Sequence, residues 1–336
     1  MREPPRVTDA TLRAALRAHY GLSATALTFL PLGNDTRSSV YRAEAGGAGY
    51  LLKVRTRAGF DPASLAIPRF LSEQGVPHIV APLPTSEGAL WVPAGDFVLT
   101  LAPFLDARTA REVGLSDAHW RALGAALRQI HASDLPPDLR RIVRQETFVP
   151  WRRSVLADLE PTFARADLAD PAQRELAAFW RARQGEIRAL IHRADTLGDE
   201  LRRASLPPAL CHADLHTWNV LLDTERRMWI VDWDEVILAP RERDLMFVVG
   251  GIGHGLVRPH ETECFLQGYG NRAVDDQALT YYRYAWAVQD MAAYAEQAFS
   301  PDSSPQARRE AVDGFLEQFA PGNIIAIARE SDPDAP

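Results

Sequence analysis

The sequence predicts an α+β protein of two lobes, a small N-terminal lobe built on an antiparallel β-sheet and a larger, mostly helical C-terminal lobe. Two observations support this class. Short β-type runs separated by turn residues fill the first part of the chain, whereas apolar residues at helical spacing dominate the remainder. With 336 residues, 46% of them hydrophobic, the chain can bury the core of one large or two medium domains.

The first lobe, 1–101, should begin with a helix over 8–19 that Thr8 can cap. Three strands are then expected over 27–32, 39–45 and 50–55. A polar loop, 33–38, joins the first two strands, and a glycine-rich turn, 46–49, joins the second to the third. This order predicts a small antiparallel sheet.

Lys53 lies inside the apolar third strand and is the only lysine of the chain, since the other basic residues are all arginine. A charge within an apolar run needs a partner when it is buried. A helix is predicted over 63–74, and Glu73 is its only acid, although Glu73 lies near the helix end. The simpler alternative places Lys53 on the solvent face of an alternating strand.

A hairpin of 89–92 with 97–101 completes the first lobe, and the lobe boundary is expected at the linker 102–105. The second lobe, 102–330, opens with a helix over 116–131. Further helices are predicted over about 151–168, 171–203 and 275–297. The tail, 331–336, is expected to be disordered.

The most informative stretch contains Asp214, Asn219 five residues later, and Asp232 thirteen residues beyond that. Apolar runs flank this set, so we expect a loop followed by a hairpin. Phosphoryl transfer from a nucleotide needs a carboxylate to orient the attacking hydroxyl, and amide and carboxylate oxygens to hold magnesium. Either Asp214 or Asn219 alone would be an ordinary turn residue, whereas the three residues together indicate one site.

The pattern His-x-Asp-x-x-x-x-Asn, followed by two apolar residues and Asp, resembles the aminoglycoside phosphotransferase and choline kinase family. The resemblance covers about 27–320 and implies a protein kinase-like fold. Within the family, the tracts 53–60 and 232–247 look most like the spectinomycin phosphotransferases. Ala213 stands where protein kinases carry Arg, and no long activation segment follows Asp232, which argues against a protein kinase.

The resemblance implies ATP and Mg²⁺ as cofactors, with GTP as an alternative nucleotide. Asp214 would be the catalytic residue, Asn219 and Asp232 the metal ligands, and Lys53 the phosphate contact. Further nucleotide contacts are expected at the loop and the linker, from Gly33, Asn34, Ser38, Thr100, Leu101 and Ala102. Supporting roles are expected for Glu73, His212 and Asp244, the last of which would brace the catalytic loop or simply be an acid at a helix start.

The expected acceptor is a cationic small molecule, most simply spectinomycin or a related aminocyclitol or aminoglycoside antibiotic, with resistance by phosphorylation. The formal net charge of −7 suits such a substrate, although mild acidity can also serve solubility alone. Candidate acceptor contacts are Asp234, Glu235 and Asp290. Choline, homoserine or another small alcohol remains an alternative acceptor, and a nucleotide-binding module without turnover remains an alternative function.

The composition also bears on partners and compartment. The acidic balance argues against nucleic-acid binding, which usually needs a basic stripe. Cys211 and Cys264 show no metal-type spacing, no signal peptide is visible, and no apolar run approaches the roughly 18 residues of a membrane span. We therefore expect a cytoplasmic protein, either a monomer or a simple homodimer, without membrane association.

Overall fold

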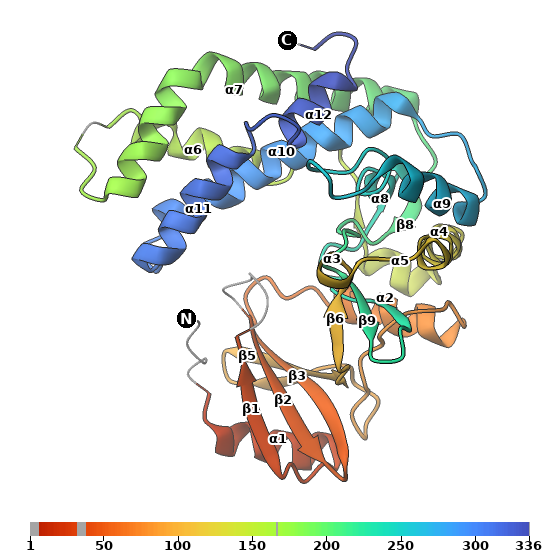
Figure 1. Ribbon diagram of the computed structural model, residues 1–336. Coiled ribbons are helices and arrows are strands. Elements are labelled where there is room, and N and C mark those ends of the chain that lie inside the picture. The colour runs from red at the N-terminus through yellow and green to blue at the C-terminus, as the bar shows by residue number, and fades with distance from the viewer. Residues whose placement is uncertain (1–6, 32–37, 166, 336) are drawn as a thin grey trace. The chain divides into compact units, whose positions relative to one another are not determined.

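The computed structural model describes residues 7–31, 38–165 and 167–335 (Figure 1). The chain divides into two compact units, which are described separately. The first contains Met1–His119, Ala132–Arg144 and Asp214–Val236, and the second contains Trp120–His131, Gln145–Ala213 and Ile237–Pro336. A five-stranded antiparallel sheet together with many helices confirms the predicted α+β class.

The sheet of the first unit has the order β1-β2-β3-β5-β4, and every pairing is antiparallel (Figure 1). Its strands are β1 (Ala26–Leu30), β2 (Ser38–Ala45), β3 (Ala48–Thr56), β4 (Val92–Ala94) and β5 (Phe97–Pro103). Helix α1 (Asp9–Tyr20) packs Leu12 and Leu16 against the sheet core, and the hydroxyl of Thr8 accepts a hydrogen bond from the Thr11 amide as the predicted cap. The predicted loop 33–38 lies outside the described residues except for Ser38.

Strand β3 separates its apolar and its basic side chains by period-two alternation. Leu52 and Val54 are buried in the sheet core, with 0% and 1% of their surface exposed. Lys53 and Arg55 therefore leave the opposite face of the same strand. The register places Lys53 between Val40 on β2 and Thr100 on β5.

The rest of the first unit carries a second, smaller sheet of order β10-β9-β6. Its strands are β6 (Ala107–Thr109), β9 (Val220–Asp223) and β10 (Met228–Ile230). Besides α1, this unit contains the helices α2 (Ala63–Glu73), α3 (Ala110–Val113) and α5 (Pro137–Ile142). The β9–β10 pair is the hairpin predicted between Asn219 and Asp232.

The second unit is mostly helical, as predicted. Its helices are most of α4 (Asp117–His131), then α6 (Arg153–Phe163), α7 (Pro171–Ala204), α8 (Glu242–Leu245), α9 (Pro259–Tyr269), α10 (Asp276–Phe299), α11 (Pro305–Glu317) and α12 (Ile324–Glu330). Strand β8 (Ala209–Cys211) pairs with β11 (Ile237–Ala239), and β7 (Arg144–Gln145) begins at the end of the first unit. Helix α10 is the centre of this unit and is packed by α6, α7, α11 and α12 (Figure 1).

The C-terminal segment makes a contact that the sequence did not predict. Asp332 is 6% exposed and accepts hydrogen bonds from Arg193 of α7 at 2.8 and 2.6 Å. This ion pair ties the segment to α7, in contrast to the disorder expected for 331–336, of which residue 336 lies outside the described part. No helix in the part of the chain that the structure describes is long and apolar enough to span a membrane.

Helices α4 and α9 approach so closely that glycine is required between them. A Cβ atom added to Gly124 would lie 2.1 Å from the carbonyl oxygen of Phe265, and one added to Gly268 would lie 2.0 Å from that of Arg121. Both obstacles are backbone atoms, which cannot turn aside as a flexible side chain could. The contact therefore fixes α9 against α4.

We predict that Gly124→Ala destabilises the fold by at least about 1–3 kcal/mol, because the two helices must separate to admit a methyl group. Gly185→Ala is the matched control, since Gly185 lies in α7 with nothing within 4 Å of an added Cβ. Its effect should stay within about 1 kcal/mol and be stabilising, as helix propensity dictates. Urea unfolding of both variants measures the difference, and equal stabilities would contradict the close approach.

Candidate active site

The loop between β8 and β9 brings Asp214 and Asn219 together. The Asn219 side-chain amide donates to the Asp214 carbonyl and to Asp214 Oδ2, both at 2.8 Å. Backbone hydrogen bonds from His216 N to Asp214 O and from Asn219 N to His216 O tighten the same turn. The loop thus fixes the Asp214 carboxylate by contacts within six consecutive residues.

Asp232 joins this loop through the neighbouring hairpin strand. The Val231 amide donates a hydrogen bond to Asn219 O at 3.0 Å. Asp232 therefore lies one residue after this direct contact with the loop. Asp232 has φ 66°, in the left-handed region that L-residues rarely adopt. This turn brings Asp232 Oδ1 to 3.9 Å from Lys53 Nζ. The structure therefore brings together Asp214, Asn219, Asp232 and Lys53, all in the first unit.

Asp234 is the centre of an ion cluster on the basic face of β3. Lys53 Nζ donates to Asp234 Oδ2 at 3.0 Å. Arg55 donates to both carboxylate oxygens, at 2.8 Å to Oδ1 and 2.7 Å to Oδ2. The side chains of Lys53, Arg55 and Asp234 are 26%, 14% and 27% exposed, so water screens this cluster only in part.

The two carboxylates of this cluster titrate in opposite directions. Burial raises the pKa of Asp232 to about 6, which the Lys53 charge opposes and the Asp234 charge reinforces. Burial would also raise the pKa of Asp234, but Lys53 and Arg55 hold that pKa well below its ordinary value. The cations therefore compensate Asp234 far better than Asp232.

Glu73, the only acid that the sequence offers on α2, is not the partner of Lys53. Glu73 Oε1 accepts from Arg69 Nε at 2.6 Å, one helical turn away on α2. Lys53 pairs with Asp234 instead. Arg69, four residues before Glu73 on the same helix, is a closer partner for it than Lys53 on strand β3. An exposed pair of this kind contributes little to stability.

Two of the three predicted acceptor contacts are paired with arginine. Asp234 is held by Arg55, and Glu235 Oε2 accepts from Arg144 Nη2 at 3.0 Å. The third, Asp290, lies on α10 in the second unit. Burial raises the pKa of Asp290 to about 7, while Arg243 and a hydrogen bond with Trp286 act in the opposite sense. An acceptor role for all three stays a prediction.

The expected nucleotide contacts lie partly within the described residues. Gly33 and Asn34 lie outside them. Ser38 pairs with Arg55 in the sheet register, and Thr100 pairs with Lys53, so both flank the basic pair on β3. Leu101 lies in β5 as expected, and Ala102, which was expected in the linker, also belongs to β5. Leu101 O already accepts a hydrogen bond from Leu83 N at 2.7 Å.

Asp244 lies at the centre of a buried hydrogen-bond network in the second unit. Its oxygens accept from the His212 amide at 3.0 Å, the Ala213 amide at 2.6 Å and His131 Nε2 at 2.9 Å. His131 Nδ1 is in turn 2.7 Å from the Tyr269 hydroxyl. His212 and Ala213 directly precede Asp214 in the chain, so these contacts are those expected of a brace for the catalytic loop.

The network keeps Asp244 charged. Burial would raise the pKa of Asp244, but the hydrogen bond from His131, the two imidazoles and the Ala213 amide hold that pKa below its ordinary value. His212 contributes through its backbone amide, and its side chain is fully buried. The charged form of Asp244 is thus more stable in the folded than in the unfolded chain, and it contributes to the free energy of unfolding.

Sequence reasoning missed two residues that contact the predicted site. His216 Nε2 lies 3.3 Å from Asp214 Oδ1, and Arg55 forms the bidentate pair with Asp234. A signal was present in both cases. Arg55 lies two residues after Lys53 on one strand face, and His216 lies two residues after Asp214 in the same tight turn.

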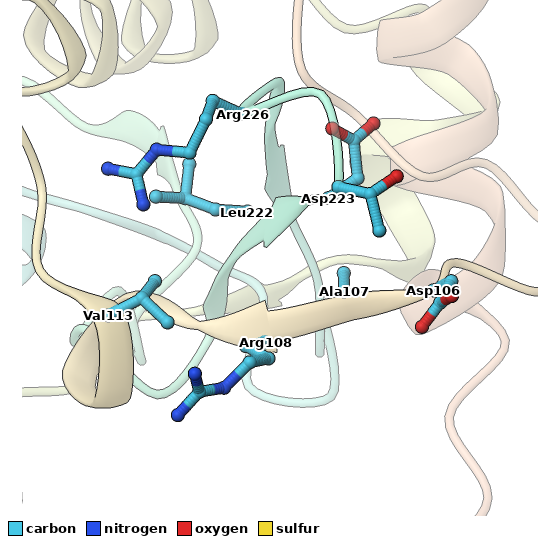
Figure 2. Close-up of a pocket in the computed structure, with 8 residues that line it drawn as sticks. Asp106, Ala107, Arg108, Val113, Leu222, Asp223 and Arg226 are labelled. Carbon is cyan, nitrogen blue, oxygen red and sulfur yellow. The ribbon is translucent and has the colours of Figure 1, made fainter.

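A separate small pocket lies on the β6–β9 pair (Figure 2). Figure 2 shows Asp106, Ala107, Arg108, Val113, Leu222, Asp223 and Arg226 around it. None of the predicted site residues that the structure describes lines this pocket. Asp223 there accepts from Arg227 at 2.8 Å and from Trp229 at 3.1 Å, contacts that stabilise the hairpin turn, and we assign the pocket no chemistry.

The fold and these residues can be compared with known proteins. Residues 28–286 match the phosphotransferase enzyme family, most of the chain, so the protein belongs to this family of kinase-like phosphotransferases. Protein StrN of Streptomyces griseus is 25% identical over 299 residues, covering 87% of this chain and 86% of StrN.

Solved structures agree with this assignment. Spectinomycin phosphotransferase APH(9)-Ia, in complex with ADP and spectinomycin, is 31% identical to this chain, with a TM-score of 0.85 and coverage of 97% of this chain and 99% of that one. Choline kinase LicA of Streptococcus pneumoniae is 13% identical, with a TM-score of 0.57 and coverage of 92% and 99%, and shows the shared fold alone.

We predict that Asp244→Asn destabilises the protein by about 3 kcal/mol at neutral pH, because it removes one charge from a buried, fully bonded network. Since the folded pKa of Asp244 lies below its ordinary value, this contribution is present above about pH 4 and is lost as pH falls further.

The gap in melting temperature between wild type and Asp244→Asn should therefore shrink on acidification below about pH 4. Asp313→Asn is the control, because the Asp313 side chain is 63% exposed in its pair with Arg309 and should contribute at most about 1 kcal/mol. A gap that is the same for both variants would argue against the brace.

Proposed function

We propose that the protein transfers the γ-phosphoryl group of ATP to a hydroxyl of a cationic small molecule, with a spectinomycin-like aminocyclitol as the first choice. The observation that carries the proposal is the hydrogen-bonded set of Asp214 and Asn219 beside Asp232 and Lys53. Similarity over almost the whole chain to a phosphotransferase whose structure contains ADP and spectinomycin supports it.

Asp214 is the proposed catalytic base. Its carboxylate would accept the hydrogen bond of the acceptor hydroxyl, orient the oxygen for in-line attack and take up the proton as the new P–O bond forms. The hydrogen bond from the Asn219 side-chain amide to Asp214 Oδ2 holds the carboxylate in one orientation. His216 Nε2, at 3.3 Å from Oδ1, lies beside the other oxygen.

The residues proposed as magnesium ligands suit a hard divalent cation. The Asn219 amide nitrogen donates to Asp214, so its oxygen faces away from that carboxylate and can serve as a ligand. Lys53 Nζ lies 3.9 Å from Asp232 Oδ1 but 3.0 Å from Asp234 Oδ2, so the Asp232 charge is less closely paired and could be compensated by a divalent cation. When bound, Mg²⁺ neutralises charge on the phosphate oxygens during transfer.

Lys53 is proposed to bind the nucleotide phosphates. Its compact ammonium leaves β3 on the same side as Asp232, between Val40 and Thr100 in the sheet. The backbone at Leu101 and Ala102 remains the proposed contact for the nucleotide base. The nucleotide is taken to be ATP, and GTP is the alternative to test beside it.

Asp290 is the carboxylate for which we propose contact with the cationic acceptor. Asp234 and Glu235 already bind arginine side chains, whereas the pKa of Asp290 is raised to about 7 by burial. A protonated amine placed beside Asp290 would favour the charged carboxylate and so be bound by it.

We expect Asp232→Ala to lower phosphoryl transfer by at least about 10³-fold, because the metal charge it holds is worth several kcal/mol in the transition state. Glu225→Ala serves as the control, since Glu225 lies on the same hairpin and is 70% exposed. Turnover is measured by release of ADP, and the melting temperature of each variant verifies folding. Activity above about one per cent of wild type would remove Asp232 from the metal site.

The acceptor class is tested by transfer of labelled phosphate from ATP to spectinomycin, other aminoglycosides, choline and homoserine. We expect turnover with spectinomycin or a related aminocyclitol, and protection of a sensitive bacterium that expresses the protein. Turnover of choline or homoserine alone would move the acceptor to another small alcohol. Nucleotide binding without turnover of any acceptor would instead favour a binding module.

A further inference from the structure

The Asp234 carboxylate binds two cations of different kinds from one strand face. Arg55 contributes two parallel hydrogen bonds, one to each oxygen, and Lys53 contributes a third to Oδ2. The guanidinium is a planar fork that matches a carboxylate, whereas the ammonium is a point charge on a flexible stem. Arg55 is therefore the fixed partner of Asp234, and Lys53 is the exchangeable one.

The charge balance of the cluster explains why two cations are needed. Lys53 lies 3.0 Å from Asp234 and 3.9 Å from Asp232, so the lysine proposed for the phosphates is bonded to a carboxylate here. A nucleotide must replace that hydrogen bond. Without Arg55, departure of Lys53 would leave Asp234, 27% exposed, as an uncompensated charge, which is costly in a partly desolvated site.

We propose that Arg55 is a positioning residue that holds Asp234 and thereby releases Lys53 for the nucleotide phosphates. Nucleotide binding exchanges the Lys53–Asp234 hydrogen bond for a Lys53–phosphate contact, while the bidentate Arg55–Asp234 pair remains. No covalent bond changes in this step. The proposal rests on the assignment of Lys53 to the phosphates, and it gives Lys53 a partner carboxylate in place of Glu73.

This exchange predicts effects of opposite sign for the two partners. In Arg55→Gln, Lys53 is the one member of the Lys53–Arg55 pair that still binds Asp234, so Asp234 holds the lysine more strongly. ADP should therefore bind about tenfold more weakly. In Asp234→Asn, Lys53 no longer has to leave a carboxylate, so ADP should bind at least as tightly as to the wild type. A purely structural role would weaken binding in both variants.

The decisive experiment is a double-mutant cycle on ADP binding in the presence of Mg²⁺, measured by calorimetry on the full chain. In the Asp234→Asn background, Arg55→Gln should change ADP affinity by no more than about twofold, because the bidentate pair through which Arg55 would act is already lost. Equal losses in both backgrounds would show that Arg55 attracts the phosphates directly, and would overturn the proposal. An ADP affinity unchanged by Arg55→Gln would overturn it as well.

Two further variants complete the test. Arg42→Gln removes one positive charge from the same sheet at an exposed pair with Glu44, and should leave ADP affinity unchanged. Arg55→Lys keeps the charge but not the fork. Arg55→Lys should weaken ADP binding less than Arg55→Gln does, and only when Asp234 is present. This variant replaces Arg55→Gln in the test if the glutamine variant does not fold.

The experiment uses no acceptor, so its result is independent of which alcohol is phosphorylated. Failure of the wild type to bind ADP would overturn both the nucleotide assignment and this inference. ADP binding by the wild type, with losses that do not depend on residue 234, would overturn this inference alone.

Discussion

The compensation of paired carboxylates by strand cations is the constraint on which the site depends. Asp232 and Asp234 are two residues apart, and their mutual repulsion must be offset for either to stay ionised. Lys53 and Arg55 supply this charge because a β-strand presents alternate residues on one face. The burial of Leu52 and Val54 on the other face fixes which side that is. Core packing of β3 therefore decides the electrostatics of the segment that follows β10.

The loop that contains Asp214 and Asn219 is held by short hydrogen bonds of two kinds. Within the loop, Asn219 binds Asp214 through side chain and backbone, so the geometry of the carboxylate is a local property. Before the loop, the amides of His212 and Ala213 are bound by the buried, charged Asp244. Because the acceptor is charged, the hydrogen bonds from both backbone amides are stronger. His131 and Tyr269 complete the network around Asp244. The charged Asp244 carboxylate thus holds in place the backbone segment that precedes Asp214.

Much of the fold could be predicted because its signals are short in range. The strands of the first lobe and the long helices of the second follow from periodicity and turn residues, and the confirmed β9–β10 hairpin links two motif residues that were expected together. Glu73 shows the limit of such reasoning. It was the only acid on its helix, yet Arg69, four residues away, reaches it more easily than a lysine on a strand. The tail prediction failed similarly, because Arg193 on α7 could not be foreseen as a partner of Asp332.

The sequence by itself determined the family, the fold class and the grouping of Asp214, Asn219 and Asp232, because a loop of six residues and one hairpin leave few ways to arrange them. Only the tertiary structure decided the partner of Lys53, which is 181 residues away in the chain, and the role of Arg55 beside it. It also decided that Asp244 binds amides 31 and 32 residues earlier. Such contacts depend on the register of strands and the packing of helices, and no local pattern encodes the distance between two side chains so far apart in sequence.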